Sequence, residues 1–588
     1  MKNARLSFGI TREQDLFRAR YWFPAVRDAA LRFRNGTVLP LHRNENGFFE
    51  GHFDEAPHPR YRLSLDGVDA PDPFARWLPE GVDGDPAVLD SATLRFRHPP
   101  VSRPIEDVVI LEVHVGCATP AGTFRALMGE LPRYRDLGIT ALELLPVNQF
   151  GGEFGWGYDG VFFFAPHHAY GSPEDLAALV DDAHRLGLMI FNDVVYNHLG
   201  PIGNPWPRSC PAFERSDHST PWGPTPDFRE TPVREMVIGN VLEWLELYRF
   251  DGLRFDAVHT LIDEGQPHIL EEIADAIRHG PGREREIHLV LENDDNEISR
   301  LRRPDGKVFD AQWNDDLHHA LHVAATGEDG HYYRDFQSEP LVQVGRCLTG
   351  SFAFHGEYSH HRGRARGERW SNASPFAFCN FAQNHDQVGN RGLGDRLNVS
   401  HGADIHWLCA FIAWLAPGIP MLWMGEESGT RRDFPFFGDY PTSLADAVRE
   451  GRKRDHQGLP GFDGPVTDPV SRQTFLAAKL PGGVEDENHA SRVKAWLEIR
   501  RRELVPRYRK MDELSGEFSV EGKLLQVRWR VPDDEGLRLV ANFSEAPALV
   551  ELPGRVLAST HNLADRTQMP ETSCKLPGWC AVLEENLR

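Results

Sequence analysis

Between residues 107 and 425, short apolar runs alternate with longer stretches of helical periodicity, and this alternation constrains the fold more than any other feature of the chain. Alternation of this kind is typical of βα units that build a parallel sheet. The predicted strands are 107–115, 139–147, 188–197, 250–258, 287–293, 307–313, 375–383 and 419–425. These eight strands, with helices between them, predict an α/β fold: a (β/α)₈ TIM barrel carrying long insertions.

Capping residues mark two of the helices between these strands. Ser172 precedes an amphipathic stretch and has Glu174 and Asp175 in its predicted first turn, where acidic groups stabilise a helix. The run that begins at His268 has the same periodicity and stops at Gly280, a residue favoured just beyond a helix C-terminus. Both stretches are therefore predicted to be helices.

The two ends of the chain alternate apolar and polar residues with the short period of β-strands. Asn35-Gly36 lies between two strand-like runs, and residues 69–90 are rich in Pro, Gly and Asp, which indicates a boundary near residue 100. After a last amphipathic helix near 488–505, strand-like alternation returns over 517–588. We expect an N-terminal immunoglobulin-like β-sandwich over 1–100, the barrel with its insertions over 101–510, and a C-terminal β-sandwich domain over 511–588.

Charge and composition exclude several classes of function. The formal net charge of −23 repels phosphate backbones, so no nucleic acid partner is expected. No apolar run approaches the roughly 20 residues of a membrane helix, so no membrane partner is expected either. Met1–Arg5 is not followed by the apolar region of a signal peptide, which favours a cytoplasmic protein. The seven scattered cysteines form no CxxC pair, which predicts buried free thiols and no zinc site.

Polar clusters follow four of the predicted strands, at the ends where such a barrel carries its active site. They are Asp193-Val-Val-Tyr-Asn197-His198, Arg254-Phe-Asp256-Ala-Val-His259, Glu292-Asn293-Asp294 and Gln383-Asn384-His385-Asp386-Gln387. Any one cluster alone is more simply explained as a structural ion pair or a helix cap. Their recurrence at the strand ends of one barrel favours an active site.

Carboxyl groups on neighbouring strands suit retaining glycoside hydrolysis, in which one attacks the anomeric carbon and the other protonates the leaving oxygen. Arg254 and Asp256 alternate along one strand and face the same side, so the guanidinium should keep Asp256 ionised as a nucleophile. Glu292 follows Leu-Val-Leu, and an apolar neighbourhood should favour the protonated form that an acid requires. Asp386 adds a third carboxylate that can hold sugar hydroxyls.

A di-metal hydrolase also gathers Asp and His at strand ends, but it usually carries an HxH or HxD ligand pair on its first strand. Glu112-Val-His114 is the nearest match in this chain. No metal site is predicted.

At the four clusters the chain resembles the α-amylase superfamily, glycoside hydrolase family 13, whose signature regions match DVVYNH, GLRFDAVH, the strand end at Glu292 and NHD in order. The resemblance implies that Asp256 is the nucleophile, Glu292 the general acid/base and Asp386 the stabiliser of the transition state. It also implies a set of residues around the cleaved sugar: Arg254, His198, His385, Asp193 and the stacking Tyr158.

Position along the chain adds further candidates for substrate contact. Asp315, His318 and His319 follow the sixth predicted strand in a loop of hydrogen-bonding groups, which favours sugar recognition, although a hydrogen-bonded helix start is the alternative. Trp156 neighbours the stacking tyrosine and could be a sugar platform. Two residues of the strand-end clusters complete the set: His259 and Gln387.

Longer stretches narrow the resemblance to the trehalose-releasing branch of that superfamily: FDAVHTLIDEGQPHILEEIA, WNDDLHHALHVAATGEDGHYY, NHDQVGNRGLGDRL and PFFGDY. This implies hydrolysis of the α-1,4 bond next to the terminal trehalose of maltooligosyl trehalose, without a cofactor and in sequence with a maltooligosyl trehalose synthase. A branching enzyme, a general α-amylase-type hydrolase and a non-catalytic glucan-binding protein are the alternatives. The chain departs from the usual pattern at Val258, at 204–213 and at Tyr440, which leaves the details of substrate recognition open.

Overall fold

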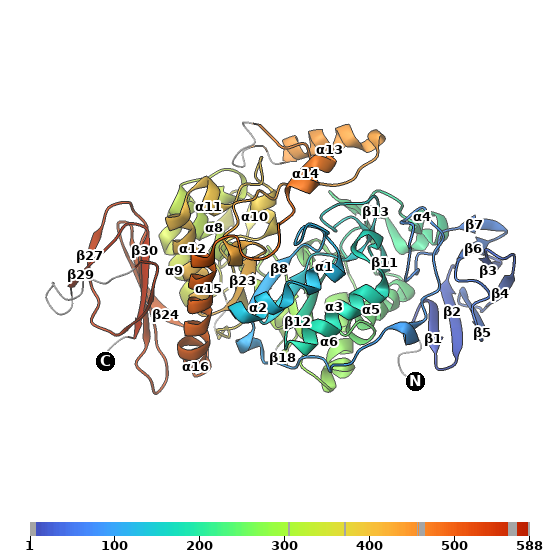
Figure 1. Ribbon diagram of the computed structural model, residues 1–588, viewed down its shortest axis with the longest axis horizontal. Coiled ribbons are helices and arrows are strands. Elements are labelled where there is room, and N and C mark those ends of the chain that lie inside the picture. Colours follow the sequence, from blue (N-terminus) through green and yellow to red (C-terminus); the bar gives the residue numbers. More distant parts are fainter. Residues whose placement is uncertain are drawn as a thin grey trace.

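The computed structural model describes residues 7–303, 306–369, 372–455, 457, 465–561 and 573–585, so the outermost ends of the predicted terminal domains lie outside it. The molecule is elongated, with the N-terminal strands at one end, the C-terminal strands at the other and the barrel between them (Figure 1). Within the described ranges, no helix is both long enough and apolar enough to span a bilayer.

Eight parallel strands close into the central barrel. They are β8 Ile110–Val113, β9 Ala141–Leu144, β12 Met189–Val194, β15 Gly252–Phe255, β16 His288–Leu291, β19 Ala311–Trp313, β22 Phe378–Asn380 and β23 Ile419–Trp423. Each lies inside one of the predicted runs, so the predicted (β/α)₈ barrel is confirmed. The ring closes where β23 pairs in parallel with β8, with Met421 opposite Ile110.

Helices pack around the barrel, as the sequence periodicity predicts. The longer ones are α3 Pro173–Arg185, α5 Thr231–Glu246, α6 Ile269–His279, α8 Asp315–Thr326, α9 Pro340–Thr349, α12 Ala403–Leu415, α13 Thr442–Asp455 and α15 Glu487–Ile499. Ser172 caps α3 by accepting a hydrogen bond from the backbone N–H of Asp175, and α6 ends at Gly280. The helical stretch after Gly122 divides into α1 Phe124–Met128 and α2 Leu131–Leu137, because Pro132 has no N–H to continue a helix.

The N-terminal region is a seven-stranded antiparallel sheet of order β1-β2-β5-β4-β3-β6-β7. Its strands are β1 Gly9–Glu13, β2 Leu16–Trp22, β3 Ala29–Phe33, β4 Val38–Arg43, β5 Phe48–Phe53, β6 Tyr61–Leu65 and β7 Val68–Ala70. The predicted Asn35-Gly36 turn joins β3 to β4, with Gly36 at a φ of 90° that glycine adopts without steric cost. The expected N-terminal β region is therefore present, while its immunoglobulin-like character stays a prediction.

Buried side chains attach this sheet to the barrel. Arg76 donates from Nε to Glu243 of α5 over 2.8 Å. Trp206 is fully buried, and its ring meets the edge of Phe74 at a centroid distance of 5.3 Å. Trp206 belongs to the segment 204–213, which departs from the family pattern. That segment therefore packs the barrel against the N-terminal sheet.

The C-terminal region is also built from antiparallel strands, in a five-stranded sheet and a two-stranded sheet. They are β24 Gly516–Glu521, β25 Leu524–Trp529, β26 Leu537–Asn542, β27 Ala548–Glu551, β28 Val556–Ser559, β29 Ser573–Leu576 and β30 Cys580–Glu585. Trp529 donates its indole N–H to the carbonyl of Leu348 in α9 over 2.7 Å, which fixes the five-stranded sheet to the barrel. All seven cysteines are free and six of them are buried, as predicted.

Candidate active site

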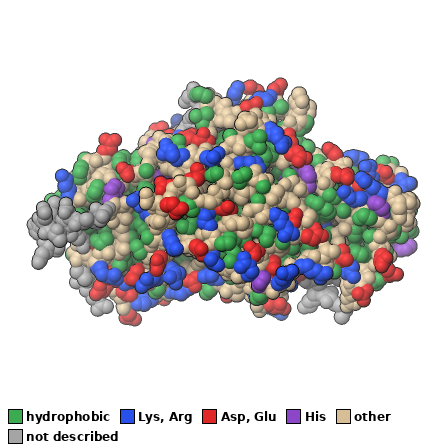
Figure 2. Space-filling model, viewed as in Figure 1, with side chains coloured by type: hydrophobic (Ala, Val, Ile, Leu, Met, Phe, Trp, Pro, Cys, Tyr) green, Lys and Arg blue, Asp and Glu red, His purple; other side chains and the backbone are tan. Residues whose placement is uncertain are grey.

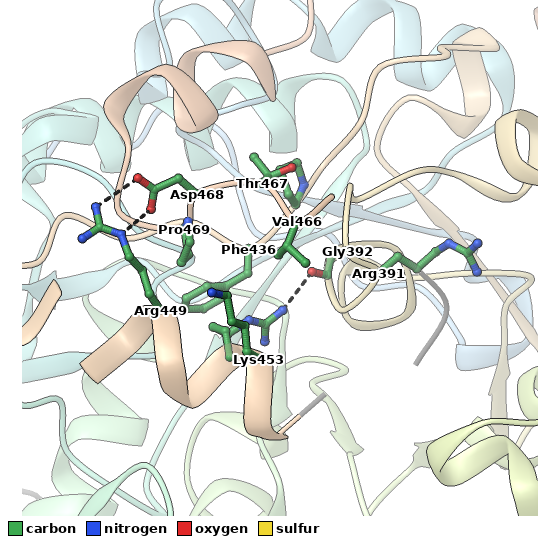
Figure 3. Close-up of a pocket in the computed structure, with 12 residues that line it drawn as sticks. Arg391, Gly392, Phe436, Arg449, Lys453, Val466, Thr467, Asp468 and Pro469 are labelled. Atoms are coloured by element: carbon green, nitrogen blue, oxygen red, sulfur yellow. Dashed lines mark hydrogen bonds and ion pairs between the residues drawn. The ribbon is translucent and has the colours of Figure 1, made fainter. Parts of the chain in front are cut away.

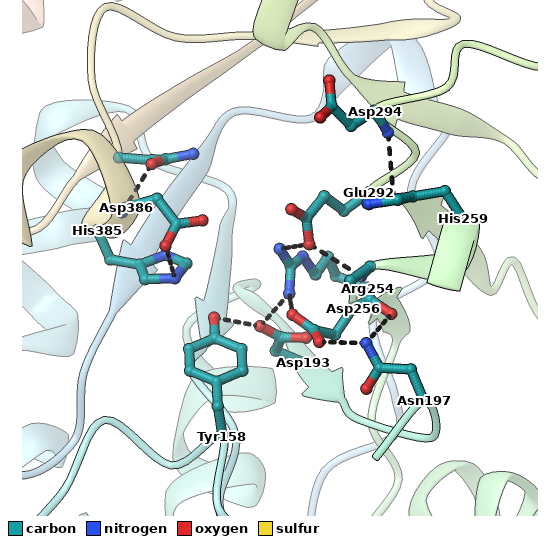
Figure 4. A network of polar contacts seen from close by, with 12 residues as sticks. Tyr158, Asp193, Asn197, Arg254, Asp256, His259, Glu292, Asp294, His385 and Asp386 are labelled. Carbon is teal, nitrogen blue, oxygen red and sulfur yellow. Dashed lines mark hydrogen bonds and ion pairs between the residues drawn. The ribbon is translucent and has the colours of Figure 1, made fainter. Parts of the chain in front are cut away.

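Side chains from several strand ends meet at one end of the barrel (Figure 4). The sequence-predicted residues that Figure 4 places together are Tyr158, Asp193, Arg254, Asp256, His259, Glu292, His385 and Asp386. They include all three carboxylates expected to act in catalysis.

The guanidinium of Arg254 is the centre of this cluster. Its Nη1 donates to Asp193 over 2.7 Å and to Asp256 over 2.8 Å, and its Nη2 donates to Glu292 over 2.5 Å. The side chain is fully buried and lies 4.0 Å from the centroid of the Trp313 ring. A buried cation that pairs with three carboxylates offsets the cost of taking these charges out of water.

Asp256 directly follows β15, and both of its oxygens are hydrogen bonded. Oδ1 accepts from Arg254, while Oδ2 accepts from the amide of Asn197 over 3.0 Å. The side-chain oxygen of Asn197 lies 2.6 Å from Nδ1 of His198, a predicted site residue that is 4% exposed. Asn197 is thus a site residue without a role in the sequence-based assignment, although it lies within the DVVYNH cluster.

Glu292 directly follows β16 and is held by residues on and just after β15. Besides Arg254, the backbone N–H of Ala257 donates to its Oε2 over 2.9 Å, and Ala257 adopts a left-handed conformation with a φ of 39°. The expectation of an apolar neighbourhood for Glu292 is therefore wrong. Successive strand residues face opposite sides, so the leucines that precede Glu292 do not surround its carboxyl group.

Asp193 at the end of β12 lies behind the catalytic carboxylates. It accepts from the hydroxyl of Tyr158 over 2.8 Å as well as from Arg254. Burial, together with the negative charge of Asp256, raises the pKa of Asp193 to about 7 against the opposing effect of Arg254. The group therefore takes up a proton near neutral pH.

Asp386 lies at the start of α10 His385–Gly389, where a capping box fixes the backbone. The side-chain oxygen of Asn384 accepts from the N–H of Asp386 over 2.9 Å, and the side-chain oxygen of Gln387 accepts from the N–H of Asn384 over 3.1 Å. The Asp386 carboxyl is 37% exposed and so remains accessible to a ligand. The amide oxygen of Gln387 serves this cap, and the sugar contact of Gln387 stays a prediction.

The ring of His385 is held between aromatic groups beside these carboxylates. It stacks on Tyr158 at a centroid distance of 5.1 Å and meets the edge of Trp156 at 5.3 Å. Its Nε2 lies 3.4 Å from Asp386, and its Nδ1 lies 2.5 Å from Glu112 of β8. The Glu112 contact was not expected from the sequence, where this residue was weighed only as a metal ligand.

Asp315 is the first residue of α8 and interacts electrostatically with two of the carboxylates, Glu292 and Asp386. Burial and the nearby charges of Glu292 and Asp386 raise its pKa to about 8. Burial and the charge of Asp386 also raise the pKa of Tyr332, whose ring lies 4.8 Å from that of His319. Nδ1 of His259 accepts from the N–H of Asp294 over 3.4 Å. Tyr332 had no sequence signal beyond the HYY run of the quoted stretch.

Three predicted substrate contacts lie behind the site instead. His318 is buried and its Nδ1 lies 2.8 Å from the carbonyl oxygen of Ala382, while His319 is 7% exposed and packs on the ring of Tyr332 at 4.8 Å. Trp156 is 6% exposed, and its ring stacks on Phe434. None of the three offers a free face to a sugar, so we correct these assignments to packing and support.

Two further tryptophans, Trp222 and Trp423, and the departure at Tyr440 have defined positions. Trp423 is fully buried, whereas Trp222 is 51% exposed and lies 5.5 Å from the ring of His198. The hydroxyl of Tyr440 donates to Asp159 over 2.6 Å. Tyr440 therefore ties the segment before α13 to the loop that carries the stacking Tyr158.

A cavity of about 180 Å³ lies between α10 and α13, outside the catalytic cluster (Figure 3). Arg449 donates to Asp468 over 2.9 Å, and Arg452 donates to Asn390 over 3.0 Å. These cations have partners within the protein, and they hold α13 against the barrel. Among the described residues, no group of three or more His, Cys, Asp or Glu is arranged to hold a metal ion.

A parallel barrel that gathers three carboxylates around one buried arginine defines a glycoside hydrolase of the α-amylase type. In agreement, the family described as "Alpha amylase, catalytic domain" matches residues 71–218, and "Domain of unknown function (DUF3459)" matches residues 514–583.

Similar proteins narrow this class. The malto-oligosyltrehalose trehalohydrolase of Deinococcus radiodurans is 39% identical over 94% of this chain and 92% of its own length. That of Saccharolobus solfataricus is 34% identical over 97% and 98%. A crystal structure of a putative alpha amylase from Salmonella typhimurium has 38% sequence identity and a TM-score of 0.91, covering 98% of this chain and 99% of that one. The chain belongs to the malto-oligosyltrehalose trehalohydrolase family.

Proposed function

We propose that the chain hydrolyses the α-1,4-glucosidic bond next to the terminal trehalose of maltooligosyl trehalose, releasing trehalose and a maltooligosaccharide. The names of its nearly full-length relatives support the substrate. The chemistry rests on one observation: Asp256 and Glu292 accept hydrogen bonds from the two terminal nitrogens of one guanidinium, that of Arg254. Two carboxyl groups so bridged are neighbours, and a retaining mechanism requires carboxyl groups about 5 Å apart.

In the first step, Asp256 attacks the anomeric carbon of the sugar to be cleaved. As the new ester bond forms, the bond from that carbon to the glycosidic oxygen breaks, and protonated Glu292 gives its proton to the leaving oxygen. Trehalose leaves with that oxygen as a hydroxyl group. Asn197 and Arg254 hold the attacking carboxylate in its orientation.

In the second step, Glu292 takes a proton from water, whose oxygen attacks the anomeric carbon and displaces Asp256. The maltooligosaccharide leaves with its original anomeric configuration. Asp386 is exposed enough to bind sugar hydroxyls and stabilises the positive charge that develops at the anomeric carbon in both steps.

The trehalose unit occupies the side of the site formed by Asp315, Tyr332 and His259. The electrostatic interaction of Asp315 with Glu292 and Asp386 supports this position. A pKa of about 8 leaves Asp315 protonated at neutral pH, so it can both donate and accept hydrogen bonds with neutral hydroxyls. Val258, where ordinary α-amylases have Lys, removes a cation from this side.

Chromatography of the products from maltotriosyl trehalose and, separately, from maltopentaose tests the proposal. We expect trehalose from the first substrate and little cleavage of the second. Comparable cleavage of both would identify a general α-glucan hydrolase, and chain transfer without hydrolysis would identify a branching enzyme. Asp256→Asn is the control. An activity that this variant retains in full does not come from this site.

The wider setting follows from the same proposal. The enzyme acts in the cytoplasm after a maltooligosyl trehalose synthase has converted the reducing end of a maltooligosaccharide into trehalose. The domains span 1–100, 101–510 and 511–588, and the family match to 514–583 supports the last boundary.

A further inference from the structure

Glu112 on β8 has a buried contact with the active site that the proposed chemistry does not use. We propose that Glu112 is a positioning residue for the reaction, which fixes the ring of His385 so that its Nε2 faces Asp386 and the cleaved sugar. This inference rests on the proposed role of Asp386.

The geometry ties Glu112 to His385 at two points. Oε1 of Glu112 lies 2.5 Å from Nδ1 of the ring, and Oε2 accepts the backbone N–H of His385 over 3.1 Å. Both residues are 1% exposed. A carboxylate that binds both the ring and the backbone of one histidine fixes the rotation and the position of the ring. Nε2 can therefore point in only one direction.

The direction of Nε2 is toward Asp386, whose carboxyl oxygen lies 3.4 Å away. The face of the ring is blocked by Tyr158, which stacks on it with an interplanar angle of 17°. Glu112, His385 and Asp386 thus form a carboxylate–imidazole–carboxylate row that leads from the barrel interior to the exposed side of the site.

The charges of the two carboxylates also determine the protonation of His385. Burial alone would lower the pKa of His385, but the carboxylates of Asp386 and Glu112 outweigh it and raise the pKa to about 9. His385 therefore carries a proton on Nε2 at neutral pH. The charged and titratable groups that face it are Glu112 on β8, His114 one residue after β8, Glu143 on β9, Tyr158, Arg254 on β15 and Asp386 on α10.

Glu143 is a neighbouring buried carboxyl group that, within the described part of the chain, lacks a histidine partner such as His385. Glu143 lies opposite Glu112 in the register of β8 and β9 and is also 1% exposed. Neither of its oxygens has a hydrogen-bond partner among the described residues. Burial raises the pKa of Glu143 well above its ordinary value, which favours the uncharged form of this group. Glu143 is therefore a matched control for Glu112.

The decisive experiment compares Glu112→Gln with the wild-type enzyme from pH 5.5 to pH 8.5, using maltotriosyl trehalose. Without the carboxylate, burial dominates and His385 loses its proton at a lower pH. We expect kcat to fall by about 10- to 100-fold at pH 8, with KM nearly unchanged, because a hydrogen bond between charged groups is lost. The loss should shrink below about pH 6, where the imidazole regains its proton.

The controls separate positioning from structure. Glu143→Gln should keep the wild-type pH profile. Glu112→Gln should add little to the loss caused by His385→Gln, because it acts through that ring. Glu112→Asp, with its shorter side chain, should show the same pH trend at smaller amplitude, and it carries the test if the Gln variant does not fold.

Two results would overturn the proposal: a loss of the same factor at every pH, or an undiminished further loss in the His385→Gln background. The proposed function is judged separately, because it fails if the wild-type enzyme releases no trehalose. In that case the ratio of variant to wild-type activity on maltopentaose still tests Glu112.

Discussion

Replacing Asp193 with asparagine tests the electrostatics of the active site through the stability of the protein. The carboxyl group of Asp193 is buried, and its pKa rises from an ordinary 3.8 to about 7 on folding. The folded protein therefore binds this proton more tightly than the unfolded chain does. Stability is greatest below the unfolded pKa and falls as the pH rises through the folded pKa.

The size of the effect follows from the shift. A difference of roughly three pKa units, at 1.36 kcal/mol each, corresponds to about 4 kcal/mol of unfolding free energy lost between pH 4 and pH 7. The amide introduced by Asp193→Asn has no proton to lose, so the variant escapes this loss. Relative to the wild-type protein, the variant should gain up to about 4 kcal/mol across this window.

Urea unfolding followed by tryptophan fluorescence at pH 4.5, 6.0 and 7.5 measures the difference. Asp446→Asn is the control, because this side chain is 93% exposed and its substitution should leave the gap to wild type constant. A gap for Asp193→Asn that does not change with pH would refute the reasoning, since it would mean that Asp193 is already ionised in the folded protein at pH 4.5.

Three further predictions concern catalysis. Asp256→Asn should lower turnover by several orders of magnitude without changing the circular dichroism spectrum, because an amide cannot form the glycosyl ester; near-normal rates would rule out the nucleophile assignment. Glu292→Gln should impair cleavage of maltotriosyl trehalose far more than of an activated aryl glycoside, whose leaving group needs no proton, and equal losses would contradict an acid role. Arg254→Lys should lower kcat/KM by about 10- to 150-fold, because an ammonium ion cannot bridge three carboxylates and each lost charged hydrogen bond costs about 1.5–3 kcal/mol; a loss below threefold would show that charge alone suffices.

The barrel and the positions of the three proposed catalytic carboxylates were predictable because their signals are local. Strands such as β12 and β16 are buried throughout and therefore appear as continuous apolar runs. Each catalytic carboxylate follows such a run, or the turn after it. The sequence thus locates Asp256, Glu292 and Asp386 without knowledge of any long-range contact.

The features that could not be predicted depend on contacts between distant segments, or on which side of a helix faces the protein interior. Glu112 and His385 are 273 positions apart, so nothing near Glu112 in the sequence reveals its partner. His318 and His319 follow Asp315 by three and four positions, but α8 packs both rings into the protein. Their polar character suggested sugar recognition, whereas tertiary packing decided their role.

Ala257, the left-handed residue after Asp256, has a consequence for how this enzyme can evolve. The N–H of Ala257 and the N–H of Val258 both bond to Glu292, the first to its carboxyl group and the second to its backbone carbonyl. The backbone itself therefore spaces the end of β15 from the end of β16. Side chains on the acceptor side can be exchanged over generations without altering that spacing, so a change of substrate need not put the reaction at risk.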